Sequence, residues 1–206
     1  MSKLIELLGA PSANIVIGKR GSGKTAFLMS VLEAAHNRGL KCYLLGLPKS
    51  KWSLLPDYIT PVRNFDSIPD NAAVACDESY IFIYAREHAK YFNRFVAKLL
   101  GTTRQKNWVL VFATHQCRKI DVGVVMDVDN IIIRQPSWLH VKYERQEIRR
   151  LIEQAAKFFN KCKEPVKHAY IYTEKGPVVV KLSLPSFWSS ELSNAFSGLS
   201  LDEMMK

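Results

Sequence analysis

Short apolar runs alternate along this chain with longer segments in which apolar residues recur every three or four positions. The runs have the length of strands, and the longer segments have the spacing of amphipathic helices. This alternation is typical of a mostly parallel β-sheet flanked by helices, so the sequence predicts an α/β fold. We predict strands at residues 13–17, 41–45, 72–76, 108–113 and 130–133, and helices at residues 25–38 and 86–103.

The pattern changes in the last third of the chain. Residues 141–161 predict one charged amphipathic helix, and residues 169–173 and 178–182 predict two strands. Between these strands, Glu174-Lys175-Gly176-Pro177 has the composition of a hairpin turn. We therefore expect a C-terminal helix followed by a β-hairpin.

The remaining segments are less regular. Residues 48–69 are punctuated by Pro, Asp and Asn and predict irregular structure, whereas residues 185–196 predict a short final helix. We expect one domain over residues 1–206, with a core at about 13–134 and an elaboration at about 139–206.

A glycine-rich stretch lies between the first predicted strand and the helix that follows it. It fits the phosphate-loop pattern G-x-x-x-x-G-K-[ST]. Its glycines permit unusual backbone angles, and N–H groups at a helix N-terminus bind anions. Lys24 adds a positive charge for the β- and γ-phosphates, and the Thr25 hydroxyl can ligate Mg²⁺. We expect ATP with Mg²⁺ to bind at Gly18, Lys19, Arg20, Gly21, Ser22, Gly23, Lys24 and Thr25.

Two adjacent carboxylates, Asp77 and Glu78, follow the predicted strand at residues 72–76. Parallel strands end at the same edge of a sheet, so Asp77 is expected beside Thr25 as a partner of Mg²⁺. Glu78 would then orient and polarise an attacking water. Because a kinase uses a substrate hydroxyl as acceptor, this pair favours hydrolysis over phosphoryl transfer.

Polar residues also follow the strand at residues 108–113, in the order Thr114-His115-Gln116. In many hydrolytic phosphate-loop proteins a polar residue at this edge, between the first and third strands, senses the γ-phosphate. Gln116 can hydrogen-bond both the phosphate and the water, and so can His115. The sequence leaves the choice between them open.

Composition narrows the classes of partner. The 206 residues carry a formal net charge of +10, more than phosphate ligands need, which favours a polyanionic partner over general solubility. The four cysteines are scattered and predict neither a disulfide framework nor a zinc site. No apolar stretch has the length of a membrane span, and the N-terminus lacks the features of a signal peptide. We expect a soluble, cytoplasmic protein.

Several residues are candidates for holding DNA through its phosphates. Trp52 and Tyr58 could stack on bases, although anchoring their own loop is the favoured interpretation. The cationic candidates at loops and strand ends are Lys49, Lys51, Arg118 and Lys119.

Four features follow one another along the chain: the phosphate loop, Asp77-Glu78, Arg104 and Ala113-Thr114-His115-Gln116. This ordered set resembles the additional-strand ATPases that include the FtsK and HerA DNA translocases. The small size is similar to viral genome-packaging ATPases, among them the packaging NTPases of archaeal turreted icosahedral viruses. The resemblance covers about residues 13–134. It implies a P-loop ATPase of the RecA or additional-strand type.

The resemblance also implies partners and one further residue role. It implies a homo-oligomeric ring that packages double-stranded DNA without regard to sequence, docked transiently on portal or vertex proteins of a capsid in the host cytoplasm. In such translocases an arginine before the sensor strand reaches the neighbouring subunit's nucleotide site. Arg104 stands at the matching place, and capping its own helix end is the equally weighted alternative. The other candidates for this role are Arg86, Arg94 and Arg118.

Three other functions compete with a packaging motor. One is an ATPase of the zonula-occludens-toxin type, which acts in secretion or filament assembly and usually carries a membrane span. Another is a small-molecule kinase, which would transfer phosphate without stimulation by DNA. The third is a slow, nucleotide-regulated binding protein that moves nothing.

Overall fold

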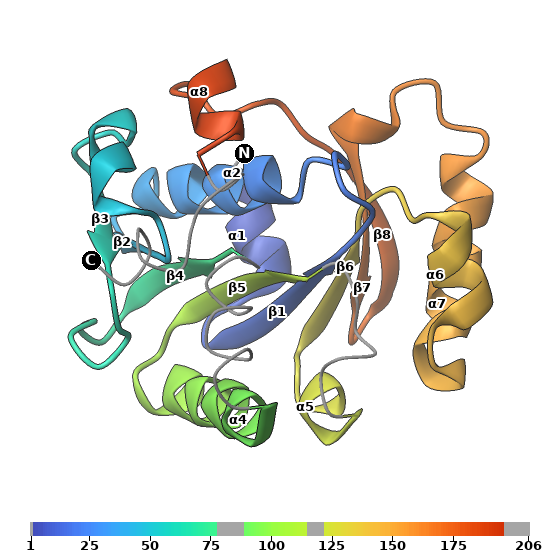
Figure 1. The fold of residues 1–206 in the computed structure, drawn as a ribbon, viewed down its shortest axis with the longest axis horizontal. Helices are drawn as coiled ribbons and strands as arrows, with labels where there is room; N and C mark the ends of the chain where they lie inside the picture. The colour runs from blue at the N-terminus through green and yellow to red at the C-terminus, as the bar shows by residue number, and fades with distance from the viewer. Residues whose placement is uncertain (1, 78–88, 115–121, 196–206) are drawn as a thin grey trace.

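The computed structural model describes residues 2–77, 89–114 and 122–195, and Figure 1 shows their arrangement. Within these residues one sheet has the strand order β3-β2-β4-β5-β1-β6-β7-β8. The first six strands in this order run parallel, and β7 pairs antiparallel with β6 and with β8. The strands are β1 Ser12–Ile17, β2 Lys41–Leu45, β3 Ile59–Val62, β4 Ala72–Cys76, β5 Val109–Thr114, β6 Asn130–Ile133, β7 His168–Thr173 and β8 Gly176–Lys181. The α/β fold with a largely parallel sheet and a C-terminal hairpin is therefore confirmed.

Strand β5 lies between β1 and β4. Thr114 pairs with Ile17 on one side, and Phe112 pairs with Cys76 on the other. The strand that precedes the predicted phosphate sensor thus lies between the strand that leads into the phosphate loop and the strand that leads to Asp77. The carboxyl ends of all three strands meet at one edge of the sheet.

Helices cover both faces of the sheet (Figure 1). Helices α1 and α2 pack with the C-terminal helix α8 on one face, whereas α4, α5 and α7 contribute to the core of the other. The helices are α1 Ser2–Leu8, α2 Lys24–His36, α4 Ala89–Gln105, α5 Val122–Met126, α6 Trp138–Tyr143, α7 Gln146–Phe159 and α8 Ser190–Ser193.

The helix that follows the phosphate loop, α2, is covered nearly all round. Only Thr25 and His36 among its residues are not buried. The buried Glu33 carboxylate accepts hydrogen bonds from the backbone N–H of Ser186, at 2.8 Å, and from its hydroxyl. These hydrogen bonds hold the C-terminal segment against α2. The phosphate loop therefore leads into a helix that is packed on nearly all sides.

The prediction of a single helix over residues 141–161 was wrong. The segment contains two helices, α6 and α7, because Glu144 and Arg145 between them adopt extended ψ angles of 161° and 148°. The Ser137 hydroxyl caps the first helix by accepting from the His140 N–H at 3.3 Å. Arg149 then donates to the Glu144 carbonyl at 2.8 Å and closes the corner.

The segment expected to be irregular, residues 48–69, contains the short 3₁₀ helix η1 Lys49–Leu54 and strand β3. Among the described strands, β3 pairs only with β2, and Pro61 is tolerated there because an edge strand needs donors on one side only. Helix α1 was not predicted.

The hairpin turn and the final helix are shorter than expected. Gly176 and Pro177 belong to β8, so the turn consists of Glu174-Lys175 alone. Within the described residues, the final helix spans only Ser190–Ser193.

Candidate active site

The phosphate loop, residues 18–25, joins β1 to α2 at the carboxyl edge of the sheet. Gly21 and Gly23 have φ angles of 72° and 82°, which side chains disfavour. Gly18 is needed because of crowding instead. A Cβ there would lie 2.6 Å from Ser22 Oγ and 2.8 Å from Arg134 Cβ.

The polar groups of the loop suit a phosphate ligand. Lys24 is buried, and its ammonium donates to the carbonyls of Gly18, at 3.0 Å, and Lys19, at 3.2 Å. Ser22 Oγ is buried and makes no hydrogen bond within the described part of the chain. The N-terminus of α2 adds N–H groups that have no acceptor inside the helix. Of the two other polar loop residues, Lys19 is half-buried and Arg20 is exposed.

Thr25 and Asp77 meet beside this loop. The Thr25 hydroxyl donates to Asp77 Oδ2 at 2.8 Å, and the Asp77 side chain is buried. A hydroxyl and a carboxylate in contact are oxygen ligands of the kind that Mg²⁺ takes next to phosphates. The residues present therefore fit a magnesium–nucleotide complex.

The other residues predicted for this edge, Glu78, His115 and Gln116, lie outside the described residues. So do Arg86 and Arg118, which are candidates for a neighbour's site, and Lys119, which is a candidate DNA contact. Their proposed roles stay predictions.

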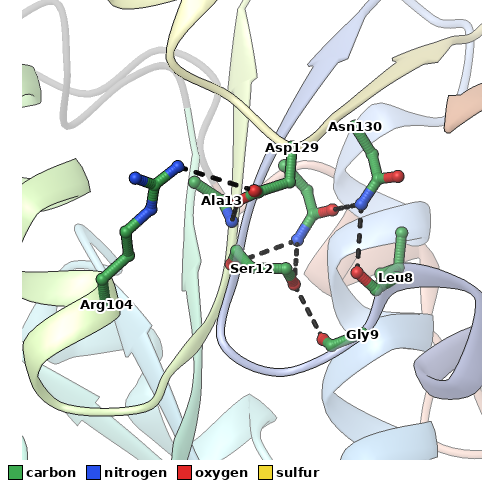
Figure 2. Close-up of polar contacts among 8 residues, drawn as sticks. Leu8, Gly9, Ser12, Ala13, Arg104, Asp129 and Asn130 are labelled. Atoms are coloured by element: carbon green, nitrogen blue, oxygen red, sulfur yellow. Dashed lines mark hydrogen bonds and ion pairs between the residues drawn. The ribbon is translucent and has the colours of Figure 1, made fainter. Parts of the chain in front are cut away.

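Arg104 points toward Asp129, next to Ala13 at the amino end of β1 (Figure 2). Its guanidinium is 3.9 Å from Asp129 Oδ1, and the other oxygen of that carboxylate accepts from the Ala13 N–H at 2.7 Å. Ala13 is at the amino end of β1, roughly 15 Å along the strand from the phosphate loop. Arg104 is therefore remote from the loop of its own chain, and its side chain is 72% exposed.

A buried polar network fixes this amino edge (Figure 2). Asn130 donates to Asn14 Oδ1 at 2.7 Å and to the Leu8 carbonyl at 3.0 Å. Asn14 in turn donates to the Leu110 carbonyl at 2.8 Å and to Ser12 Oγ at 3.0 Å. The network joins α1, β1, β5 and β6 beneath the ion pair of Arg104.

Sequence reasoning missed Arg134, which directly follows β6. Only 1% of its surface is exposed, and burial lowers its pKa to about 10. Its guanidinium donates to the Ser22 carbonyl inside the phosphate loop. A charged residue immediately after an apolar strand at the carboxyl edge was the available signal.

The candidate DNA contacts give a mixed result. Lys49 is exposed, but Lys51 lies 3.7 Å from the Glu191 carboxylate. Trp52 donates to the Leu47 carbonyl at 2.9 Å, and the Tyr58 ring stacks on His36 with 4.0 Å between centroids. The interpretation of these two rings as loop anchors is confirmed.

Within the described residues, no helix combines the length and apolar character needed to cross a bilayer.

No protein-family model matches the sequence, and no curated protein matches it. The fold, however, matches solved structures. The genome packaging NTPase B204 from Sulfolobus turreted icosahedral virus 2, in complex with AMPPCP, superposes with a TM-score of 0.58 at 15% identity, over 84% of this chain and 99% of that one. B204, the DNA-packaging ATPase from Sulfolobus turreted icosahedral virus, gives 0.56 at 12% identity, over 85% and 98%.

A third similar structure is the pCW3 conjugation coupling protein TcpA, solved with ATPγS. Its TM-score is 0.57 at 12% identity, over 82% of this chain and 60% of that one. The expected resemblance to packaging NTPases and their larger relatives is thus confirmed at the level of the fold.

Proposed function

We propose that this chain is a magnesium-dependent ATPase that couples hydrolysis to the movement of double-stranded DNA and packages a viral genome. The observation that carries the ATPase proposal is the hydrogen bond between Thr25 and Asp77 beside a phosphate loop whose buried polar groups suit phosphate. The strand order supports it, because β5 separates β1 from β4, as is expected for many hydrolytic phosphate-loop proteins.

Each residue then has a chemical task. The loop N–H groups, Ser22 and Lys24 bind and orient the phosphates, while Thr25 and Asp77 hold Mg²⁺, which would neutralise developing charge. Glu78 orients and polarises the attacking water. Gln116, with His115 as the alternative, senses the γ-phosphate.

DNA packaging is supported by two independent features. The fold is similar to that of two structures described as genome- or DNA-packaging proteins, and the net charge of +10 suits a polyanionic track. Contacts with phosphates rather than bases would make movement indifferent to sequence.

A homo-oligomeric ring is supported by the place of Arg104. Because Arg104 is exposed and lies far from its own phosphate loop, any nucleotide site that it completes belongs to a neighbouring copy; capping the end of its own helix is the alternative role. We infer one domain over residues 1–206, because β7 continues the core sheet from β6 and the segment after β8 packs over α2. The motor would act in the host cytoplasm, docked transiently on portal or vertex proteins of a capsid.

The test is the rate of ATP hydrolysis with and without double-stranded DNA across a salt series. We expect stimulation that weakens steeply as salt rises and does not depend on sequence. Lys24→Ala should lose nucleotide binding, and Glu78→Gln should bind nucleotide without turnover. Retained turnover in the Glu78 variant would remove the role of this glutamate.

Similarity to the conjugation coupling protein favours a second candidate, an ATPase that serves transfer or secretion machinery, the class that includes the zonula-occludens-toxin type. It predicts ATP hydrolysis by a protein that assembles with membrane-bound transfer machinery and not with a capsid, whether or not DNA stimulates the rate. Phosphate transfer to a small hydroxyl compound would instead identify a kinase. Nucleotide binding with very slow hydrolysis and no response to DNA would identify a regulated binding protein.

A further inference from the structure

Arg134 joins three backbone carbonyls that belong to two separate segments. Its Nε donates to the Ser22 carbonyl at 3.1 Å, its Nη1 donates to the His168 carbonyl at 2.8 Å, and its Nη2 donates to the Val166 carbonyl. Ser22 belongs to the phosphate loop, whereas the other two flank the start of β7. One side chain thus links the loop to the strand that begins the C-terminal hairpin.

Within the described part of the chain, no negative charge balances this guanidinium, and burial alone lowers its pKa. Within the described residues no carboxylate forms an ion pair with it, and all three of its acceptors are neutral carbonyls. A buried cation without a counter-ion is costly, so a reason for its presence is needed. Phosphate groups bound in the adjoining loop would supply the missing negative charge.

The contacts with the loop are close on two sides. A Cβ on Gly23 would lie 2.7 Å from Arg134 Nη2, and a Cβ on Gly18 would lie 2.8 Å from Arg134 Cβ. The backbone N–H of Arg134 also donates to the Ile17 carbonyl at 2.7 Å, just before the loop begins. Two of the loop's glycines are therefore packed against this residue.

The bond to Ser22 sets the direction of a peptide plane. In a trans peptide the carbonyl and the following N–H point in opposite directions. Since the Ser22 carbonyl is held toward Arg134, the Gly23 N–H is directed away from it. Because Arg134 binds this carbonyl on one side of the loop, the Gly23 N–H is available to an anion on the opposite side.

We propose that Arg134 is a positioning residue that keeps the loop N–H groups aimed at the phosphates and couples phosphate binding to the start of β7. This inference rests on the proposed nucleotide binding at the same loop. It assigns no direct contact between Arg134 and the nucleotide. Both the charge and the three-way fork of the guanidinium are required.

The test compares the dissociation constants of a non-hydrolysable ATP analogue and of inorganic pyrophosphate across variants. Arg134→Met removes the charge and the fork, and Arg134→Lys keeps the charge but cannot span three carbonyls. The matched control is Arg149→Met, because Arg149 also donates to a carbonyl, that of Glu144, far along the chain from the loop. Each variant is checked for folding by its thermal unfolding transition.

We expect Arg134→Met to weaken both ligands at least about tenfold, the scale of one lost hydrogen bond to a charged group. Arg134→Lys should also bind both ligands more weakly, whereas Arg149→Met should bind them with the affinity of the unchanged protein. The KM for ATP should rise, whereas a purely structural loss would lower kcat through a smaller active fraction and leave KM unchanged. Wild-type affinity in Arg134→Met would overturn the proposal, and wild-type affinity in Arg134→Lys would overturn the need for the fork.

A second measurement needs no variant. Amide hydrogen exchange of the unchanged protein is followed over residues 162–169 with and without pyrophosphate, which has no base or ribose to touch this segment. We expect slower exchange there and no change over residues 138–149. Unchanged exchange in the first segment, with pyrophosphate bound, would overturn the coupling. If the unchanged protein binds neither ligand, the proposed ATPase function fails instead.

Discussion

Thr25 Oγ1 and Asp77 Oδ2 are 2.8 Å apart although the two residues are separated by 52 positions in the sequence. Thr25 is at the start of α2, and Asp77 directly follows β4. The parallel sheet makes this contact possible because it delivers both elements to its carboxyl edge. The contact brings together a hydroxyl and a carboxylate where the phosphate loop ends.

Replacing Asp77 with Asn should weaken magnesium binding without disturbing the fold. The amide keeps the size of the side chain but loses the charge that Mg²⁺ requires, so affinity for Mg²⁺–ATP should fall about 10- to 100-fold. The measurement is nucleotide binding with Mg²⁺ and with a chelator. Affinity in the chelator should change little, and Asp66→Asn, at an exposed ion pair with Lys98, is the control.

The phosphate loop should not tolerate a methyl group at its first glycine. Gly18→Ala places a Cβ against Ser22 Oγ and Arg134, so we expect at least about tenfold weaker nucleotide binding. Gly101→Ala in α4 is the matched control, since a Cβ there meets nothing within 4 Å. This control should raise stability by about 0.5–1 kcal/mol, as Ala does over Gly in a helix. Normal binding by Gly18→Ala would contradict the crowding argument.

Mixing variants can show whether Arg104 acts in a neighbouring copy. Arg104→Ala should cost less than about 1 kcal/mol of stability because its ion pair is exposed, yet it should abolish turnover in the assembled protein. Lys24→Ala subunits lack a working loop but keep Arg104. Mixed with Arg104→Ala subunits, they should restore part of the ATPase rate.

The exposed Arg150 in α7 supplies the control for this experiment. Arg150→Ala should keep full turnover. If Arg104→Ala is fully active in the assembly, or if mixing restores nothing, the arginine of the neighbouring site must be another residue.

The Asn14–Asn130 network should contribute to stability at a level unusual for side-chain amides. Asn130→Ala leaves Asn14 Oδ1 and the Leu8 carbonyl without their donor, at a cost of about 1–3 kcal/mol for each buried group. Urea unfolding measures the change. Gln154→Ala, which removes an exposed acceptor of the Tyr172 hydroxyl, should cost less than about 1 kcal/mol.

Cys42 should make the protein less stable at alkaline pH. Burial raises the pKa of its thiol from 9.0 to about 12, and the thiol donates to the Leu32 carbonyl. Above pH 9 the unfolded chain releases this proton and the folded chain keeps it, so stability falls as pH rises toward 12. The loss approaches about 1.4 kcal/mol per pH unit.

The check is the urea midpoint of the unchanged protein and of Cys42→Ala at pH 8, 9 and 10. The variant should be less stable at pH 8 but should lose stability more slowly as pH rises. Parallel pH profiles would contradict the protected state of the thiol.

The strongest local patterns predicted most of the sheet. Strands β2, β4 and β6 have the predicted bounds, because each is a short apolar run between turn residues. Edge strand β3 was missed because it is only four residues long, only Ile59 in it is buried, and Pro61 interrupts the run of strand-forming residues. The corner between α6 and α7 was missed because the apolar spacing continues across Glu144, whose extended backbone is held by Arg149.

The sequence by itself determined the phosphate loop, its position between a strand and a helix, and the carboxylate that follows a buried strand. These are local patterns, in which spacing alone dictates the geometry. Only the tertiary structure decided that Thr25 touches Asp77, that Arg134 supports the loop from behind, and that Arg104 lies at the far edge of the sheet. Each of these depends on contacts between segments far apart in the chain, which strand order sets and no local spacing encodes.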